Sequence, residues 1–299
     1  MNATAEAITK GSKTSFYYSF SLLPKHKREA IHAVYAFCRY TDDIVDEEVD
    51  ERRKVVLLRK WRMEFGRSLR GRSSYTLLNQ LSAAAQRFNI PVNHFYDLFR
   101  GMEMDLSKTR YRTFEELREY CYLVASTVGL MCRSIFGYRN ESTREYAINL
   151  GIALQLTNIL RDVKDDARKG RIYLPLEDME RFGYSEDDLL NFRYTPAFVN
   201  LMRFECGRAR ECFTLAREAL RDEDKYFFFP ARIMWSIYAH TLVRIERSNY
   251  NVFERRISIS KFLKLLIAFR YWLSHRLKYT WLGRPWALDE HIRQAPTGL

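Results

Sequence analysis

Two acidic segments of this 299-residue chain carry the side chains best suited to chemistry. In the first, Asp42, Asp43 and Asp46 form the pattern DDxxD. At about 100° per residue, Asp42 and Asp46 fall on one stripe of a helix, which Tyr35 and Arg39 share. Two carboxylates one helical turn apart repel each other unless a cation lies between them. Because apolar neighbours indicate burial, the segment predicts a hard divalent cation such as Mg²⁺.

The second acidic segment repeats this arrangement about 120 residues later. Gln155, Asn158, Asp162 and Asp166 fall on one stripe of a helix that is otherwise rich in Leu, Ile, Ala and Val, whereas Asp165 lies outside the stripe. The stripe begins with amides, which hydrogen-bond phosphate or water, and it ends with carboxylates.

A single D-x-x-x-D pattern on a helix is most often a solvated face. Two such stripes on apolar helices predict that the helices face each other and form a carboxylate-lined cleft. Carboxylates that hold several Mg²⁺ ions are suited to diphosphates, whose oxygens complete the metal coordination. Departure of an allylic diphosphate leaves a carbocation, which requires an apolar cavity lined by aromatic rings. The predicted reaction class is therefore metal-assisted prenyl transfer.

The rest of the chain predicts the helices that position these stripes. Apolar residues recur at helical spacing, and only 12 Gly and 7 Pro interrupt them. We expect an all-α, single-domain protein over residues 1–299, with a loose leader at 1–12. The expected helices are residues 14–20, 25–47, 50–69, 74–88, 92–106, 114–136, 142–166, 196–220, 224–249 and 258–280.

The longest expected irregular stretch, residues 168–195, follows the second acidic helix directly. It carries Arg168, Lys169 and Arg171. Such a basic loop beside an acidic site is either a phosphate-binding lid or a solvated charge run.

The composition limits the classes of partner. The formal net charge is +12, but the basic residues are dispersed and no nucleic-acid motif is present, so no nucleic-acid partner is expected. Phosphate substrates or an anionic membrane account for the charge instead. The N-terminus lacks a signal-peptide core, and the five cysteines contain no CxxC pair, so a cytoplasmic, reduced protein is expected. The sequence contains no Gly-rich dinucleotide-binding motif, so no NAD(P)H cofactor is expected.

The C-terminal segment concentrates the positive charge. Residues 251–299 contain nine Lys and Arg against three Asp and Glu. Within them, Lys261 to Lys278 forms a basic amphipathic stretch, part of the expected helix 258–280. The stretch is too charged to span a bilayer. It either packs on its own domain or lies on an anionic membrane, which would attach the protein peripherally to the inner face of that membrane.

Four segments resemble the squalene/phytoene synthases, in matching order and spacing over roughly residues 12–270. They are SFYYSFSLLP (Ser15 to Pro24), AVYAFCRYTDDIVDE (Ala33 to Glu47), YCYLVASTVGL (Tyr120 to Leu130) and LGIALQLTNILRDVKDDARKGRIYLP (Leu150 to Pro175). The resemblance implies an isoprenoid-synthase helical bundle with a central apolar cavity. It also implies head-to-head (1′–1) condensation of two identical prenyl diphosphates through a cyclopropylcarbinyl diphosphate.

The resemblance also implies a role for individual residues. Two or three Mg²⁺ ions, for which Mn²⁺ can substitute, would be held by Asp42, Asp46, Asn158, Asp162 and Asp166. The substrate would be bound by Ser15 and Phe16 at the mouth of the diphosphate pocket, by Tyr35 at the reaction centre, and by Arg39, Gln155, Asn158 and Arg161 at the diphosphate. The four metal-binding aspartates, with Tyr120 and Tyr238 beside the migrating cation, would form the catalytic set.

The identity of the product stays open at this level. Thr41, ahead of the DDxxD pattern, is similar to phytoene synthases, which use geranylgeranyl diphosphate for carotenoids. Gly101 to Leu106 resembles hopanoid-pathway enzymes, which convert farnesyl diphosphate to presqualene diphosphate or squalene. Phytoene is the favoured product. A head-to-tail elongating enzyme, a terpene cyclase and a non-catalytic lipid-binding subunit are the competing functions, and the oligomeric state is unknown.

Overall fold

The computed structural model describes residue 20, residues 23–46 and residues 50–280. The helices in this part are α3 (Lys25–Asp46), α4 (Glu51–Ser68), α5 (Thr76–Arg87), α6 (Asn93–Ser107), α7 (Phe114–Cys121), the π-helix η1 (Tyr122–Ser126), α8 (Thr127–Phe136), α9 (Thr143–Arg168), α10 (Leu176–Arg181), α11 (Glu186–Leu190), α12 (Pro196–Ala219), α13 (Phe229–Arg247) and α14 (Lys261–Thr280). Within it no β-strand forms, and an isolated parallel bridge joins Arg110 to Ile172. The all-α prediction is confirmed.

Most of the expected helices are present with ends shifted by a few residues, and one stretch differs in kind. The stretch 168–195 was expected to be irregular but contains α10 and α11. Local capping explains α11, because Ser185 and Asp188 form a reciprocal capping box at its start. The expected leader 1–12 and helix 14–20, apart from Phe20, lie outside the described residues.

An aromatic cluster fixes the orientation of α3. The ring of Phe37 packs against Phe99 and Phe95 of α6, with centroids 5.5 Å and 5.7 Å away. One turn later, the Oγ of buried Thr41 accepts a hydrogen bond of 3.0 Å from Nε1 of Trp61 on α4. Thr41 therefore serves the packing of α3 on α4. Because these contacts use one face of α3, the opposite face carries its acidic stripe.

Close packing also fixes α9, the second acidic helix. A Cβ on Gly151 would lie 2.5 Å from Cα of Ser126, so only glycine allows α9 to approach η1 this closely. The Oγ of Ser126 then donates a hydrogen bond of 2.8 Å to the carbonyl of Ile148. A π-helix in this position widens one turn of the helix that faces α9.

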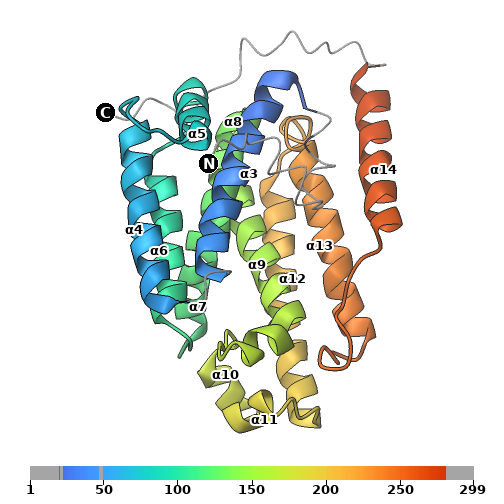
Figure 1. Cartoon of the computed structure of the whole chain (residues 1–299). Helices are drawn as coiled ribbons and strands as arrows, with labels where there is room; N and C mark the ends of the chain where they lie inside the picture. The colour runs from blue at the N-terminus through green and yellow to red at the C-terminus, as the bar shows by residue number, and fades with distance from the viewer. Residues whose placement is uncertain (1–19, 21–22, 47–49, 281–299) are drawn as a thin grey trace.

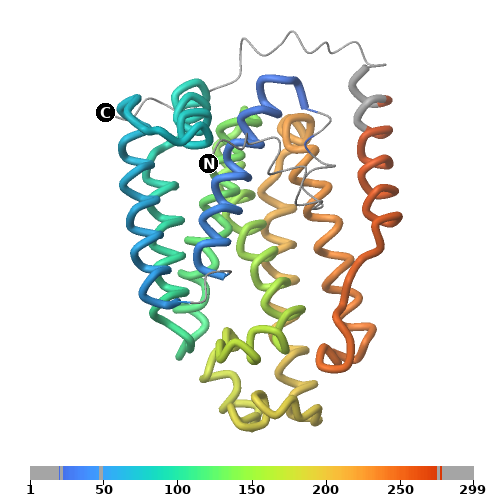
Figure 2. The backbone as a smooth tube through the Cα atoms, viewed as in Figure 1, coloured from blue at the N-terminus to red at the C-terminus, as the bar shows by residue number. Residues whose placement is uncertain are grey.

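The helices form an elongated bundle in which α9 packs against α8, α12 and α13 (Figure 1). The path of the chain shows α10 and α11 at the end of the bundle where α9 ends, and α14 at the edge beside α13 (Figure 2). None of the helices in the described ranges combines the length and the apolarity that a bilayer crossing requires.

Candidate active site

The acidic stripe of α3 carries one basic residue among its carboxylates. Nη2 of Arg39 lies 2.7 Å from Asp43 and its Nη1 lies 3.8 Å from Asp42. Although about half of the Asp42 side chain is exposed (49%), partial burial and the neighbouring Asp46 raise its pKa to about 7. A raised pKa shows that a second negative charge is poorly neutralised here, which is the electrostatic condition that favours a bound cation.

The acidic stripe of α9 has the same character. Arg161 donates from Nε to Oδ1 of Asp162 over 2.9 Å, and Nη2 of Arg256 lies 3.6 Å from the same oxygen. Burial, followed by repulsion from Asp162, raises the pKa of Asp166 to about 7. Asp165, which was predicted to fall outside the stripe, is exposed. Both carboxylates of the stripe therefore lie in a partly buried environment.

The end of α9 turns the basic loop back toward this stripe. Gly170 adopts a φ of +74°, its N–H bonds to the carbonyl of Ala167, and the N–H of Arg171 bonds to the carbonyl of Asp166. These two bonds form a Schellman cap, which stops the helix and reverses the chain. The reversed segment is then held by the N–H of Ile172, which donates to the carbonyl of Thr109 over 2.9 Å.

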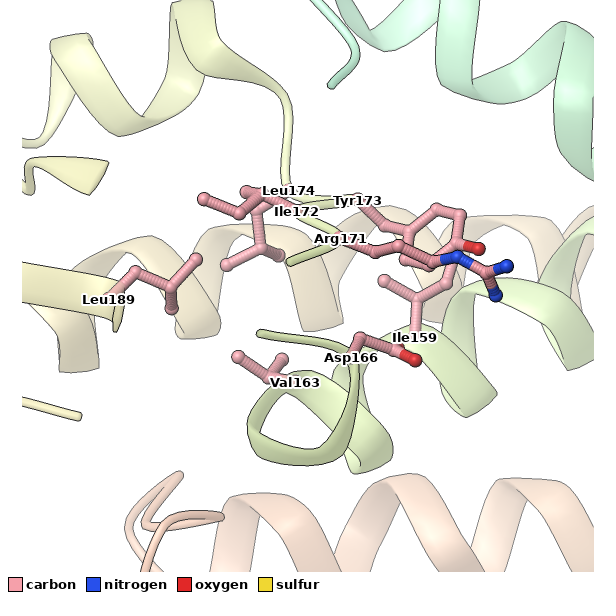
Figure 3. Close-up of a pocket in the computed structure, with 8 residues that line it drawn as sticks. All are labelled: Ile159, Val163, Asp166, Arg171, Ile172, Tyr173, Leu174 and Leu189. Carbon is pink, nitrogen blue, oxygen red and sulfur yellow. The ribbon is translucent and has the colours of Figure 1, made fainter. Parts of the chain in front are cut away.

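The side chain of Arg171 joins the two stripes. Its Nη1 lies 2.9 Å from Oδ1 of Asp46, and its positive charge also acts on Asp166. Figure 3 shows the polar ends of Asp166, Arg171 and Tyr173 on one side of a pocket that has apolar residues on its other side. The predicted basic loop therefore contacts the acidic site through Arg171 and through Lys169, whose Nζ lies 3.8 Å from Oδ2 of Asp46, whereas Arg168 is exposed.

The carboxylates remain grouped as one pair on each helix. Asp46 on α3 contributes to the raised pKa of Asp166 on α9, so the two carboxylate pairs lie close enough to repel each other. Among the residues that the structure describes, no three His, Cys, Asp or Glu side chains form a metal centre from protein ligands alone. Mg²⁺ is commonly held by one or two carboxylates and completes its coordination with phosphate oxygens or water.

A cluster of tyrosines surrounds a further carboxylate, Asp105 on α6. Its two oxygens accept hydrogen bonds of 2.8 Å each from the hydroxyls of Tyr120 and Tyr173. The two rings stack with centroids 5.3 Å apart, and Tyr111 packs against both. Asp105 also acts electrostatically on Asp42, which places the cluster beside the α3 stripe. Tyr120 is consequently fixed in position by Asp105.

Nearer the N-terminus of α9, the stripe contains an amide, Asn158, whose side-chain oxygen has no hydrogen-bond donor. Asn158 donates from Nδ2 to Oε1 of Gln155 over 3.4 Å, but its Oδ1 is buried and accepts no hydrogen bond. Burial raises the pKa of the Tyr238 hydroxyl, an effect that Arg161 and Asn158 partly offset. Tyr35 also acts on Tyr238, so α3 and α13 meet the stripe at this level. Leaving a buried acceptor unpaired costs free energy, which points to a ligand at Oδ1.

The structure thus brings together the predicted residues that it describes, and it adds others. The predicted Ser15 and Phe16 lie outside the described residues. Sequence reasoning missed Asp105, Tyr173 and Arg256, and it left the role of Arg171 open. Arg171 lies in the basic run after the acidic helix, and Tyr173 and Asp105 lie in the family-like segments Leu150 to Pro175 and Gly101 to Leu106, but those segments assigned neither of them a role in the site.

An all-helical bundle with a carboxylate pair on each of two helices that share one site defines the class of protein found here. Comparison with known families specifies it: residues 9–262 match the model of the squalene/phytoene synthases. The chain therefore belongs to the squalene/phytoene synthase family, as its motifs predicted, and it is a prenyltransferase.

Individual relatives agree with this assignment. The chain is 39% identical to the phytoene synthase of Arthrospira platensis over 272 residues, which cover 87% of this chain and 88% of that protein. It is 39% identical to the 15-cis-phytoene synthase of Synechocystis over 278 residues, which cover 89% and 82%. A crystal structure of a dehydrosqualene synthase in complex with a ligand superposes with a TM-score of 0.80 at 30% identity, covering 90% of this chain and 94% of the other.

Proposed function

We propose that this enzyme joins two molecules of geranylgeranyl diphosphate head to head and forms phytoene, a step of carotenoid synthesis. The similarity to phytoene synthases over most of both chains supports the C20 substrate. The observation that carries the reaction class is the meeting of two carboxylate pairs through Arg171. A site with separate carboxylate pairs on facing helices and cations between them suits a ligand that carries several negative charges.

We propose Asp42, Asp46, Asn158, Asp162 and Asp166 as the residues that hold Mg²⁺, or Mn²⁺ in its place. The raised pKa of Asp42 and Asp166 and the unpaired Oδ1 of Asn158 fit a cation at each stripe. Mg²⁺ is commonly held by one or two carboxylates together with substrate phosphates, in agreement with the separate pairs. When bound, the ions supply positive charge that neutralises the departing diphosphate.

The basic residues of the site are proposed to bind the diphosphate oxygens. Arg39, Arg161, Arg171 and Arg256 each lie within 4 Å of a carboxylate of the stripes. A guanidinium that already lies beside the site needs only to exchange a carboxylate for phosphate, which it binds in the same two-pronged geometry. Gln155 is proposed to orient Asn158, and the predicted place of Ser15 and Phe16 at the mouth of the diphosphate pocket remains part of the proposal.

The tyrosines are proposed to face the cation that ionisation leaves behind. Tyr238 interacts with Asn158 and Tyr35, and Tyr120 is hydrogen-bonded to Asp105, which acts electrostatically on Asp42. Aromatic faces stabilise a cation without offering a nucleophile. Asp105 accepts hydrogen bonds from the Tyr120 and Tyr173 hydroxyls, and these bonds fix the orientation of the two rings.

We also propose that the protein works in the cytoplasm at the inner face of the membrane. Its substrate carries a long apolar chain and its proposed product is a lipid, so both partition into bilayers.

Product analysis tests the function. Purified protein is incubated with Mg²⁺ and either geranylgeranyl or farnesyl diphosphate, and the extracted lipids are analysed by mass spectrometry. A C40 hydrocarbon with release of inorganic diphosphate is the expected result, and EDTA should abolish it until Mg²⁺ is restored. If only farnesyl diphosphate were converted, to a C30 product, the assignment would change from phytoene synthesis to the squalene-type reaction. A longer prenyl diphosphate or a cyclic terpene would overturn the head-to-head assignment.

A further inference from the structure

Large exposed apolar side chains concentrate on one helix, α14. The most exposed are Phe262 and Phe269, with 76% and 55% of their surfaces open to solvent. The exposed apolar residues of α14 are Phe262, Leu265, Leu266, Phe269, Leu273 and Leu277, which we call the α14 stripe. Such residues elsewhere in the described chain, for example Val56 and Met63 on α4, are fewer on any one element. A contiguous exposed apolar surface marks an interaction site.

The α14 stripe is separate from the face by which the helix packs. At about 100° per residue its members fall within roughly 120° of the helix circumference. Ile267 and Ala268 are buried and point to the other side, where α14 packs beside α13 (Figure 1). On that inner side, Arg232 of α13 lies over the ring of Tyr271, 5.2 Å from its centroid. The helix is therefore apolar on two faces, and only one of them is covered by the described part of the chain.

The charge of α14 indicates what meets its outer face. Its twenty residues include five Lys and Arg and no Asp or Glu. Lys261 and Arg270, which flank the stripe on α14, are exposed, and in the preceding loop Arg255 and Arg256 are exposed beside Glu254. On α14 the apolar residues are bordered by basic residues and by no acidic ones. This combination matches an anionic lipid surface, because apolar side chains enter the acyl region and the anionic headgroups attract the basic side chains. A second copy fits poorly, because a two-fold interface would bring two purely cationic helices together.

We propose that the α14 stripe inserts into an anionic bilayer, with α14 lying in the plane of the interface. The inner face of the same helix borders the candidate active site, because the charge of Arg161 acts on Lys264. Membrane attachment through α14 therefore places the diphosphate site next to the lipid from which the prenyl chain comes. This surface deepens the proposed function and rests on it only for the identity of that lipid substrate.

Vesicle binding by the full chain tests this surface without requiring turnover. Sedimentation with phosphatidylcholine vesicles is compared with vesicles that contain roughly one third phosphatidylglycerol. The unaltered protein should bind the anionic vesicles, and raising the salt should weaken binding because it screens the charges. A variant with Phe262, Leu266, Phe269 and Leu273 all changed to Ser should bind about tenfold more weakly or worse.

Two further variants make the test specific. Val56→Ser with Met63→Ser removes exposed apolar residues from α4 and should leave vesicle binding unchanged. Lys261→Gln with Arg270→Gln should weaken binding to anionic vesicles about fivefold per charge. Circular dichroism and thermal unfolding verify that each variant folds. If the serine variant does not fold, the Lys261→Gln, Arg270→Gln variant still tests the proposal.

The outcomes separate this proposal from its competitors. Equal vesicle binding by the folded stripe variants and the unaltered protein would overturn it, as would the absence of any vesicle binding by the unaltered protein. A dimer in sedimentation equilibrium that the serine variant dissociates, without vesicle binding by either, would instead assign the stripe to a second copy. Vesicle binding together with no C40 product in the assay above would uphold the surface and refute the proposed function.

Discussion

Nη1 of Arg171 lies 2.9 Å from Oδ1 of Asp46, although 125 positions separate the two residues in the chain. The contact joins the end of α3 to the segment that leaves α9, and only 14% of the Arg171 side chain is exposed. A guanidinium held in this position is available to a diphosphate as soon as cations neutralise the carboxylates around it.

Replacing this guanidinium should therefore impair catalysis. Arg171→Gln is expected to lower kcat/KM by about 10²-fold, because it removes a charge that stabilises the leaving diphosphate. Arg171→Lys should retain part of the activity, since it keeps the charge but not the two-pronged geometry. Steady-state diphosphate release measures the effect. Arg168→Gln, three positions away on the exposed side, is the matched control, and an equal loss in both variants would contradict a specific role for Arg171.

The helical stripes make a second prediction that contrasts neighbouring aspartates. Asp162→Asn and Asp166→Asn should each reduce kcat by about 10²- to 10³-fold or more, because each removes a charged oxygen proposed to hold Mg²⁺. The near-isosteric amide should preserve the fold, as thermal unfolding would verify. Asp165→Asn alters an exposed carboxylate in the same segment and should remain active. Full activity of Asp162→Asn would remove the metal assignment from α9.

The raised pKa of Asp166 predicts how the metal-free protein responds to pH. The pKa is 3.8 in an unfolded chain and about 7 in the folded protein, so between these values the folded state holds a proton that the unfolded state has lost. The Asp166 contribution to the free energy of unfolding therefore decreases as the pH rises from about 4 to about 7. Urea unfolding in EDTA measures this, with Asp166→Asn as the comparison.

When Mg²⁺ replaces EDTA in the urea-unfolding measurement, it should stabilise the unaltered protein more at pH 8 than at pH 5, because the cation competes with the proton for the carboxylate. Asp166→Asn should show a flatter dependence on pH in EDTA. Identical pH profiles of the variant and the unaltered protein would show that Asp166 does not titrate in this range.

The Schellman cap of α9 allows backbone strain to be separated from function. Gly170→Ala places a side chain at a φ of +74° and should destabilise the fold by about 1 kcal/mol. Because the N–H of Arg171 completes the cap, we also expect slower diphosphate release. Gly71 ends α4 in the same way, with a φ of +68° and no atom near its missing Cβ. Gly71→Ala should therefore match the loss of stability and leave activity intact.

Helical periodicity sufficed to predict much of the site. Asp42 and Asp46 lie one turn apart within a few residues of sequence, and so do Asp162 and Asp166, so their shared stripes follow from the pitch of a helix. The all-α class followed from the same periodicity and the scarcity of Gly and Pro. The family could be predicted because its motifs are continuous segments of the chain, and the match of residues 9–262 to the family model confirmed it.

The other contributions to the site come from contacts between distant segments. Asp105 ends up beside Asp42 because α6 packs on α3, and Tyr173 reaches Asp105 because the chain reverses at Gly170. Neither residue belongs to a stripe with a recognisable spacing. Similarly, Arg256 comes from the loop after α13 and reaches Asp162 only through the packing of α13 on α9.

The C-terminal helix shows the same division. Its basic, apolar composition is a property of the sequence, and that composition is compatible both with packing on the domain and with membrane binding. The structure shows that α14 buries Ile267 and Ala268 while it exposes Phe262 and Phe269. Local sequence determined the elements and the polar stripe of each, because those depend on neighbours within one or two turns. Tertiary packing alone decided which stripes meet and which apolar face stays open, because those depend on residues tens to hundreds of positions apart.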